Sequence, residues 1–289
     1  FYIEQGVNNM SIGVQDFDSK VQEAINRKQP VSLVERLLTK DVRDNVKNIN
    51  LDFLVGLPFQ TEETMRTTMR QAADLAPDRI SLCFFHYTTK FHPHMKKLEP
   101  HLPTFYERKK VFNAGVDTLL ANGFVRTGFE HFAKEDSVVA KSIKDKKATY
   151  TSLGVINQKT NVIASGRSGH SILGDDFLIQ NFYEQALYGG ALSLNQFPVY
   201  RGMRLRPEDA LRRNMIRQLR TYFELEANPD FKEHFAKEVD ALKPFEEDGL
   251  VVIAPDKITI SEKGKLFTDL IISIFDEYKE KPRIRKKKE

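Results

Sequence analysis

Two short apolar runs decide the fold: Met10-Ser-Ile-Gly-Val-Gln-Asp-Phe17 and Asn50-Leu-Asp-Phe-Leu-Val-Gly-Leu-Pro58. Each has the length of a strand, and the second ends at a glycine and a proline. About 35 residues of largely helical pattern separate Ser11–Val14 from Leu51–Val55. Strand, helix and strand at this spacing are typical of a βαβ unit. We therefore expect the two runs to be adjacent parallel strands.

Polar residues stand at the carboxyl ends of these runs. Strands of parallel sheets read as continuous apolar segments, so Gln15 and Asp52 are unusual there. Barrels and open α/β sheets place ligands at this edge. We expect Gln15, Asp52 and His86, which follows the next strand-like run, to face one cavity. We expect Arg27, about three helical turns after Gln15, to reach the same place.

The rest of the first half alternates helical and strand-like patterns, which is typical of a parallel barrel. Ser32 and Thr61 are the expected helix caps. Met65 and Met69 begin a buried helical stripe, and Gly123 is expected to end a long helix. The expected strands are residues 79–85 and a run over 124–132, and the expected helices are residues 18–27, 61–75 and 103–122.

The second half has a different pattern. Residues 149–174 are strand-like, and residues 249–261 predict a β-hairpin. Helices are expected over residues 176–188, 207–225, 230–245 and 264–278. Helices followed by a hairpin resemble a winged-helix unit. The predicted fold class is thus α/β, a partial (β/α) barrel followed by a mostly helical carboxyl-terminal domain with a winged-helix-like hairpin.

This pattern predicts four parts. They are the second half of a barrel (1–133), a mixed connecting or substrate-side region (134–206), the winged-helix-like domain (207–280) and a basic tail (281–289).

Charge and composition limit the class of protein. The net charge is +4, but residues 281–289 carry +5, so the remainder has a charge of −1 and no basic excess for nucleic acid. No run of 18 apolar residues is present, so we expect no membrane span. We expect a cytoplasmic monomer. The sequence does not favour a zinc site built from His86, His92, His94 and His101, because these lie in a Lys- and Pro-rich segment without fixed ligand spacing.

Several motifs resemble one enzyme family. Met10–Phe17, Ile25-Asn-Arg27 and Asp52–Pro58 are similar to the middle of a radical S-adenosylmethionine (SAM) enzyme, and in particular of the oxygen-independent coproporphyrinogen III oxidases. Further segments that resemble them are Gly128-Phe-Glu-His-Phe-Ala133, Tyr200-Arg-Gly-Met203, Arg212-Arg-Asn-Met-Ile216, Asp248-Gly-Leu-Val251 and Thr259-Ile-Ser-Glu-Lys-Gly264. The resemblance extends from about Gly6 to Tyr278.

The resemblance implies an activity and its cofactors. In such an enzyme a reduced 4Fe-4S cluster cleaves SAM, and the resulting radical removes hydrogen from a propionate of coproporphyrinogen III, which then loses CO2. An electron donor protein and a tetrapyrrole are the implied partners. Gln15, Arg27 and Asp52 would line SAM sites. Arg201, Arg204 and Arg212 are candidates, with Arg27, for pairing with substrate carboxylates.

The sequence also departs from the family. Cys83 is the one cysteine, whereas the cluster needs at least three thiolates. We therefore expect the chain to be a carboxyl-terminal portion of a longer enzyme, inactive alone. His86 and His170 stand at positions expected to contact the cofactor, but differ from the family. Alternatives are a haem-handling or methyl-transferring radical SAM relative, or a non-catalytic tetrapyrrole or haem binder.

Overall fold

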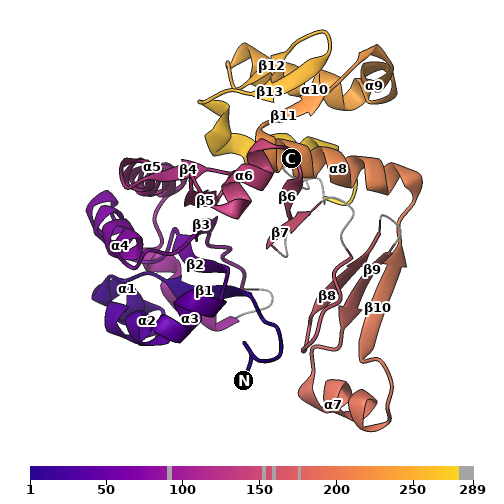
Figure 1. Cartoon of the computed structure of the whole chain (residues 1–289). Coiled ribbons are helices and arrows are strands. Elements are labelled where there is room, and N and C mark those ends of the chain that lie inside the picture. Colours follow the sequence, from indigo (N-terminus) through magenta and orange to yellow (C-terminus); the bar gives the residue numbers. More distant parts are fainter. Residues whose placement is uncertain (90–92, 152–153, 158–160, 175–176, 280–289) are drawn as a thin grey trace, which may run out of the picture. The chain divides into compact units, whose positions relative to one another are not determined.

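The computed structural model describes residues 1–89, 93–151, 154–157, 161–174 and 177–279. The chain divides into two compact units, Phe1–Lys141 and Ser142–Glu289 (Figure 1). Each unit has its own sheets and helices and is described separately below. No helix within the described part of the chain is both long and apolar enough to cross a membrane.

The first unit contains a five-stranded sheet in the order β1-β2-β3-β5-β4. Its strands are β1 (Asn9–Gln15), β2 (Asn48–Val55), β3 (Arg79–Phe84), β4 (Phe124–Arg126) and β5 (His131–Lys134). β1, β2 and β3 are parallel neighbours, which confirms the predicted βαβ pairing. Within the described residues β1 pairs with β2 alone, so it forms one edge of the sheet.

The predicted single run over residues 124–132 was wrong. β4 and β5 are two antiparallel strands, and β5 is also antiparallel to β3. A tight turn separates them, in which the Thr127 amide donates to the His131 carbonyl at 2.9 Å. The Arg126 guanidinium closes this turn, because its Nη2 donates to the Phe129 carbonyl at 2.7 Å. Apolar composition alone does not reveal such a reversal.

Helices connect these strands. They are α1 (Ser19–Ala24), α2 (Val31–Leu37), α3 (Lys40–Asn45), α4 (Glu62–Asp74), α5 (Phe105–Ala121) and α6 (Val138–Lys144), with the 3-10 helix η1 (Pro93–His101). Thr61 caps α4 as predicted, through a capping box with Thr64. Ser32 does not cap α2, because the helix already begins at Val31 and Pro30 occupies its N-cap position without a side-chain hydrogen bond.

One face of the first sheet is apolar and the other is polar. Along β2, Leu51, Phe53 and Val55 are fully buried, whereas Asp52 and Leu54 between them are only half-buried. The predicted stripe of α4 is confirmed, with Met65 and Met69 buried completely. Since side chains alternate along a strand, the polar residues of β2 all lie on the opposite face.

The second unit is built from hairpins and helices (Figure 1). Its strands are β6 (Ala148–Thr151), β7 (Gly154–Asn157), β8 (His170–Leu173), β9 (Phe177–Asn181), β10 (Val199–Arg204), β11 (Glu224–Glu226), β12 (Val251–Ile253) and β13 (Lys257–Ile260). Its helices are α7 (Gln185–Ser193), α8 (Pro207–Tyr222), α9 (Pro229–His234), α10 (Ala236–Glu247) and α11 (Thr268–Ile272), with 3-10 helices η2 (Gly264–Phe267) and η3 (Ser273–Phe275).

Three helix predictions for this unit need correction, and the first is the helix over 230–245, which is divided at Phe235 into α9 and α10. Residues 177–181 are a strand, because they pair with both β8 and β10, and α7 starts only at Gln185. The predicted helix over 264–278 is broken into short α and 3-10 segments. The hairpin over 249–261 is confirmed by the antiparallel pairing of β12 with β13. Tertiary pairing thus overrides local helical pattern in β9.

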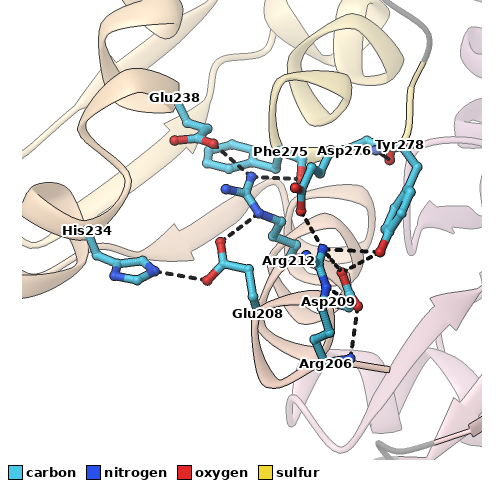
Figure 2. A network of polar contacts seen from close by, with 10 residues as sticks. Arg206, Glu208, Asp209, Arg212, His234, Glu238, Phe275, Asp276 and Tyr278 are labelled. Atoms are coloured by element: carbon cyan, nitrogen blue, oxygen red, sulfur yellow. Dashed lines mark hydrogen bonds and ion pairs between the residues drawn. The ribbon is translucent and has the colours of Figure 1, made fainter. Parts of the chain in front are cut away.

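A network of ionic contacts joins α8 to its neighbours (Figure 2). Asp209 is buried and accepts hydrogen bonds from the Arg206 side chain, with Nη2 at 2.8 Å, and from the Tyr278 hydroxyl at 3.0 Å. The Arg206 guanidinium holds the pKa of the Asp209 carboxyl well below its usual value. Nearby, Arg212 lies between Glu208 and Glu238, with an N–O distance of 2.8 Å to each. Charged groups are therefore used structurally here.

Candidate cofactor site at the carboxyl edge of the first sheet

Three of the predicted site residues meet at Gly13. A Cβ atom on Gly13 would lie 2.8 Å from Nε2 of Gln15 and 3.5 Å from Nη2 of Arg27. Asp52 is the residue that pairs with Gly13 across the two strands. The absence of a side chain at Gly13 therefore leaves room for the other groups. The structure brings Gln15, Arg27 and Asp52 together, as the sequence predicts.

Gln15 has an unusual backbone. Its φ is +76°, a left-handed conformation that non-glycine residues seldom adopt. The pairing of β1 with β2 shifts between Gly13 and Gln15, as in a β-bulge. This bulge turns the Gln15 side chain back over Gly13. Such strained residues cluster at functional sites, where the surrounding structure holds them in place.

Arg27 reaches Gly13 from a turn, and the prediction that it lies on a helix was wrong. α1 ends at Ala24, and Asn26 has a φ of +53°. The left-handed Asn26 reverses the chain, so that the exposed Arg27 returns toward β1. Its Nη2 donates to the Gly13 carbonyl at 2.6 Å and its Nε to the Gln29 side chain at 3.0 Å. Three of the five guanidinium N–H groups remain available to a ligand.

Asp52 is oriented by its neighbours on the polar face. Ser11 Oγ donates to its Oδ2 at 2.5 Å, and Asn50 Nδ2 donates to its Oδ1 at 2.7 Å. The row continues across the sheet, because Ser81 Oγ donates to Asn50 Oδ1 at 3.2 Å and His131 Nδ1 lies 3.3 Å from Ser81 Oγ. The carboxylate keeps free lone pairs. It can therefore accept further hydrogen bonds from hydroxyl or ammonium groups.

A buried carboxylate next to the bulge in the chain holds the end of β1 in place. Asp16 is completely buried and accepts hydrogen bonds from Gln60 Nε2 at 2.6 Å, Thr68 Oγ1 at 2.9 Å and the Asp18 amide at 2.7 Å. Burial raises the pKa of the Asp16 carboxyl above its usual value, although these hydrogen bonds oppose the shift. Asp16 thereby ties the end of β1 to α4 and to the segment after β2.

Gln60 completes this support. Its Oε1 accepts from the amides of Gly56 at 2.7 Å and Leu57 at 2.9 Å, and its Nε2 also donates to the Leu54 carbonyl at 2.7 Å. With the bond to Asp16, both donors and the acceptor of this buried amide are used. The loop after β2 is thus held rigidly beside Gln15.

Sequence analysis missed these supporting residues. Ser11 and Gly13 stand two positions apart, as do Asn50 and Asp52, and none of them is apolar in side chain. Residues two apart lie on the same face of a strand, so this spacing could have indicated a polar sheet face. Asp16 and Gln60 gave no such signal, because they lie 44 residues apart in the sequence. Their contact depends on the tertiary fold.

The two predicted histidines belong to different units of the chain. His86 is exposed and follows β3 by two residues, beyond the last backbone contact to β2 at Phe85. His170 lies on β8, in the second unit. Within the described residues no group of three metal-ligating side chains is found, and His92 lies outside those residues. The basic tail over 281–289 is also outside them.

The chain's likeness to known proteins agrees with this architecture. A family model for the HemN C-terminal domain matches residues 205–267. The oxygen-independent coproporphyrinogen III oxidase of a Synechocystis species is 32% identical over 94% of this chain and 61% of its own length. The oxidase of Helicobacter pylori is also 32% identical, over 95% of this chain and 62% of its own length. The chain thus spans about three fifths of these curated relatives.

A solved structure is similar as well. The coproporphyrinogen III oxidase HemN of Escherichia coli, which is described as a radical SAM enzyme, matches with a TM-score of 0.84 and 29% identity. The match covers 95% of this chain and 65% of that one. The fold is therefore the mixed α/β fold found in a radical SAM enzyme. More particularly, the chain is similar to the oxygen-independent coproporphyrinogen III oxidases, and the resemblance seen in the sequence is confirmed.

Proposed function

We propose that this chain contributes SAM-binding residues to an enzyme that oxidatively decarboxylates coproporphyrinogen III to protoporphyrinogen IX in haem biosynthesis. The observation that carries this proposal is the meeting of Gln15, Arg27 and Asp52 at Gly13. The similarity to the oxidases over 94% of the chain supports the choice of substrate. When bound, SAM would supply the radical that starts the reaction, and the residues of this chain would bind and orient it.

The chemistry of the three side chains fits SAM. The free N–H groups of Arg27 suit its carboxylate, since guanidinium and carboxylate pair in a planar, two-bond geometry. Asp52, held by Ser11 and Asn50, suits a ribose hydroxyl or the ammonium group. Gln15 supplies amide donors and an acceptor for an adenine edge or the ribose.

The iron–sulfur cluster does not fit this chain. A 4Fe-4S cluster of this kind needs at least three thiolates, and Cys83 is the one cysteine in the sequence. Its ligands would have to come from outside these 289 residues.

The proposal extends to the architecture and setting of the enzyme. The parallel strands β1 to β3 are proposed to be part of a (β/α) barrel, and residues 207–280 a winged-helix-like domain. Residues 1–133 and 134–206 are proposed to be the barrel portion and the connecting region. We further propose a cytoplasmic monomer that receives electrons from a donor protein, and cofactor contacts at His86 and His170.

Titration of SAM into the full-length, cluster-reconstituted protein tests the proposal. Arg27→Ala should weaken SAM binding about tenfold or more, because a charge-assisted contact contributes roughly 1.5–3 kcal/mol and 1.4 kcal/mol is tenfold. Arg27→Lys should also weaken it, since lysine keeps the charge but loses the planar fork. The control is Arg36→Ala, at an exposed position of α2.

Thermal unfolding of the same variants separates binding from folding. The exposed Arg27 should be replaced without a large change in melting temperature. Unchanged SAM affinity in Arg27→Ala would show that the arginine only closes the turn onto Gly13. Equal losses in Arg27→Ala and Arg36→Ala would also contradict the proposed contact.

A further inference from the structure

The sheet β8-β9-β10 has one face on which a polar row lies beside an apolar row. Side chains alternate, and the strand pairing places His170, Gln180 and Arg201 side by side. The next row on the same face consists of Ile172, Leu178 and Met203. These six residues, together with Ser171, Ile179 and Gly202 between them on the strands, line a cavity of about 370 Å³.

Only one N–H group of Arg201 donates a hydrogen bond among the described contacts in this cavity. Its Nε donates to Gln180 Oε1 at 2.8 Å, which holds the guanidinium at the border of the apolar row. Its Cζ lies 5.6 Å from the centre of the Tyr200 ring. None of the described residues offers Arg201 a carboxylate within ion-pair distance. An arginine oriented by an amide, but without an acidic partner, is suited to an anionic ligand.

The apolar row is accessible beside this guanidinium. Met203 is 42% exposed, whereas Ile172 below it is 6% exposed. A ligand here would meet apolar side chains over most of its surface and a positive charge at one end. This arrangement selects an amphipathic molecule that carries a carboxylate.

The opposite face of the sheet differs. Asn181, which alternation places on that face, is buried and donates to the Gly166 carbonyl at 2.9 Å. The segment around Gly166 therefore covers it. Arg204 belongs to this opposite face, since it is three residues from Arg201 on the same strand. The structure thus separates two arginines that the sequence treats alike.

We propose that the β8–β10 face binds the porphyrinogen substrate, with Arg201 pairing with one propionate carboxylate and Ile172, Leu178 and Met203 contacting a pyrrole ring. This inference rests on the proposed function, because it takes the substrate to be a tetrapyrrole with carboxylate side chains. It adds the residues that recognise the substrate, apart from those proposed for SAM.

Coproporphyrin III, the stable fluorescent oxidised form of the porphyrinogen, is the probe. It is titrated into the full-length protein without SAM and without cluster reconstitution, and quenching of its fluorescence reports binding. Arg201→Gln should weaken binding about tenfold, and Arg201→Lys less. Arg204→Gln, the matched control on the opposite face, should change the affinity less than about twofold. Met203→Glu, at an exposed position, should also weaken binding by placing a negative charge beside the ligand.

Circular dichroism of each variant checks folding, and SAM titration provides the comparison. Equal effects of Arg201→Gln and Arg204→Gln, or no effect of Arg201→Gln and Met203→Glu, overturn the inference. Loss of SAM affinity with unchanged porphyrin affinity assigns the cavity to SAM and also overturns it. A haem absorption shift lost in His170→Gln but kept in Arg201→Gln assigns the cavity to haem ligation instead. In each case the Arg27 titration still decides the SAM contacts separately.

Discussion

Asp16 in the first unit and Asp209 in the second are both buried carboxylates, yet their pKa values move in opposite directions. Asp16 accepts hydrogen bonds from an amide side chain, a hydroxyl and a backbone amide, all neutral, and burial raises its pKa. Asp209 accepts from the Arg206 guanidinium and the Tyr278 hydroxyl, and the arginine lowers its pKa. At Asp16 burial outweighs the hydrogen bonds from neutral groups, whereas at Asp209 the bonds to the Arg206 guanidinium outweigh burial, and this decides the sign of each pKa shift.

The difference matters for what each unit does. Around Asp209 the charges are neutralised within the protein, as expected of a structural contact. Asp16, which follows the strained Gln15 in the chain, is a buried carboxylate whose described hydrogen bonds all come from neutral groups. Uncompensated groups of this kind are typical of functional sites. The raised pKa of Asp16 is thus consistent with the site proposed in the first unit.

The largest expected effect on stability comes from a substitution that places a second carboxylate next to Asp16. Gln60→Glu replaces the Nε2 donor that lies 2.6 Å from Asp16 Oδ2 by an oxygen. We expect a loss of about 3 kcal/mol in the free energy of unfolding at pH 8. The loss should shrink toward pH 5, because the two carboxyl groups can then share a proton. Urea unfolding followed by circular dichroism at both pH values measures this.

Gln5→Glu is the control for that substitution, since Gln5 is exposed in the same unit. It should change the free energy of unfolding by less than about 0.5 kcal/mol at either pH. If Gln60→Glu behaved in the same way, the Asp16–Gln60 contact would not be part of the folded protein in solution.

The second expected effect is an opposite pH dependence at the two carboxylates. A lowered pKa means that Asp209 stabilises the fold above its usual pKa of 3.8 and loses this contribution as the pH falls. The melting temperature of Asp209→Asn should therefore lie below that of the unmodified protein at pH 7 by about 4 °C or more, and the difference should begin to narrow only as the pH falls below 3.8.

For Asp16 the sign is reversed. Its raised pKa means that its contribution to stability is greatest at acid pH and is lost as the pH rises through that pKa. The unmodified protein should thus gain in melting temperature relative to Asp16→Asn on acidification. Parallel pH profiles for the two asparagine variants would refute the comparison.

A smaller effect is expected at Gln15. Gln15→Gly removes the cost of a left-handed φ on a non-glycine residue, of about 1 kcal/mol, but increases the freedom of the unfolded chain. The free energy of unfolding should change by less than about 1 kcal/mol, while SAM affinity falls. A large loss of stability would show instead that the Gln15 side chain is a packing residue.

The smallest effect is expected for an exposed ion pair. Lys40 Nζ lies 2.5 Å from the Asp44 carboxylate, but the two side chains are 88% and 56% exposed. Solvent screens such pairs, so Lys40→Gln should change the free energy of unfolding by less than about 0.5 kcal/mol. Urea unfolding measures this change. A larger loss of free energy of unfolding would mean that an exposed ion pair stabilises the fold as much as a buried one.

Local patterns predicted some elements well and others poorly. The parallel pairing of β1 with β2, the Thr61 cap and the α4 stripe depend on residues close in sequence or on a strong period, and these were predicted correctly. β9 was mistaken for a helix because its strand character comes from β8 and β10 on either side. The prediction that Asp52 stands at the end of its strand was wrong, since three residues of β2 follow it, and it lies beside the end of β1 because it pairs with Gly13. The turn at Asn26 and the Asp16–Gln60 contact were not predictable, since each depends on backbone geometry or distant residues.

The bulge in β1 makes chain length a determinant of the site. Between Gly13 and Gln15 the chain uses two residues where β2 uses one, from Asp52 to Phe53. The extra residue, Val14, is buried, so the core holds it in place. Deleting one residue here would restore regular pairing, but it would rotate the following side chain to the other face of the sheet. Homologues that keep the glutamine but shorten this strand by one residue should therefore have lost the arrangement around Gly13, even though an alignment would show every site residue present.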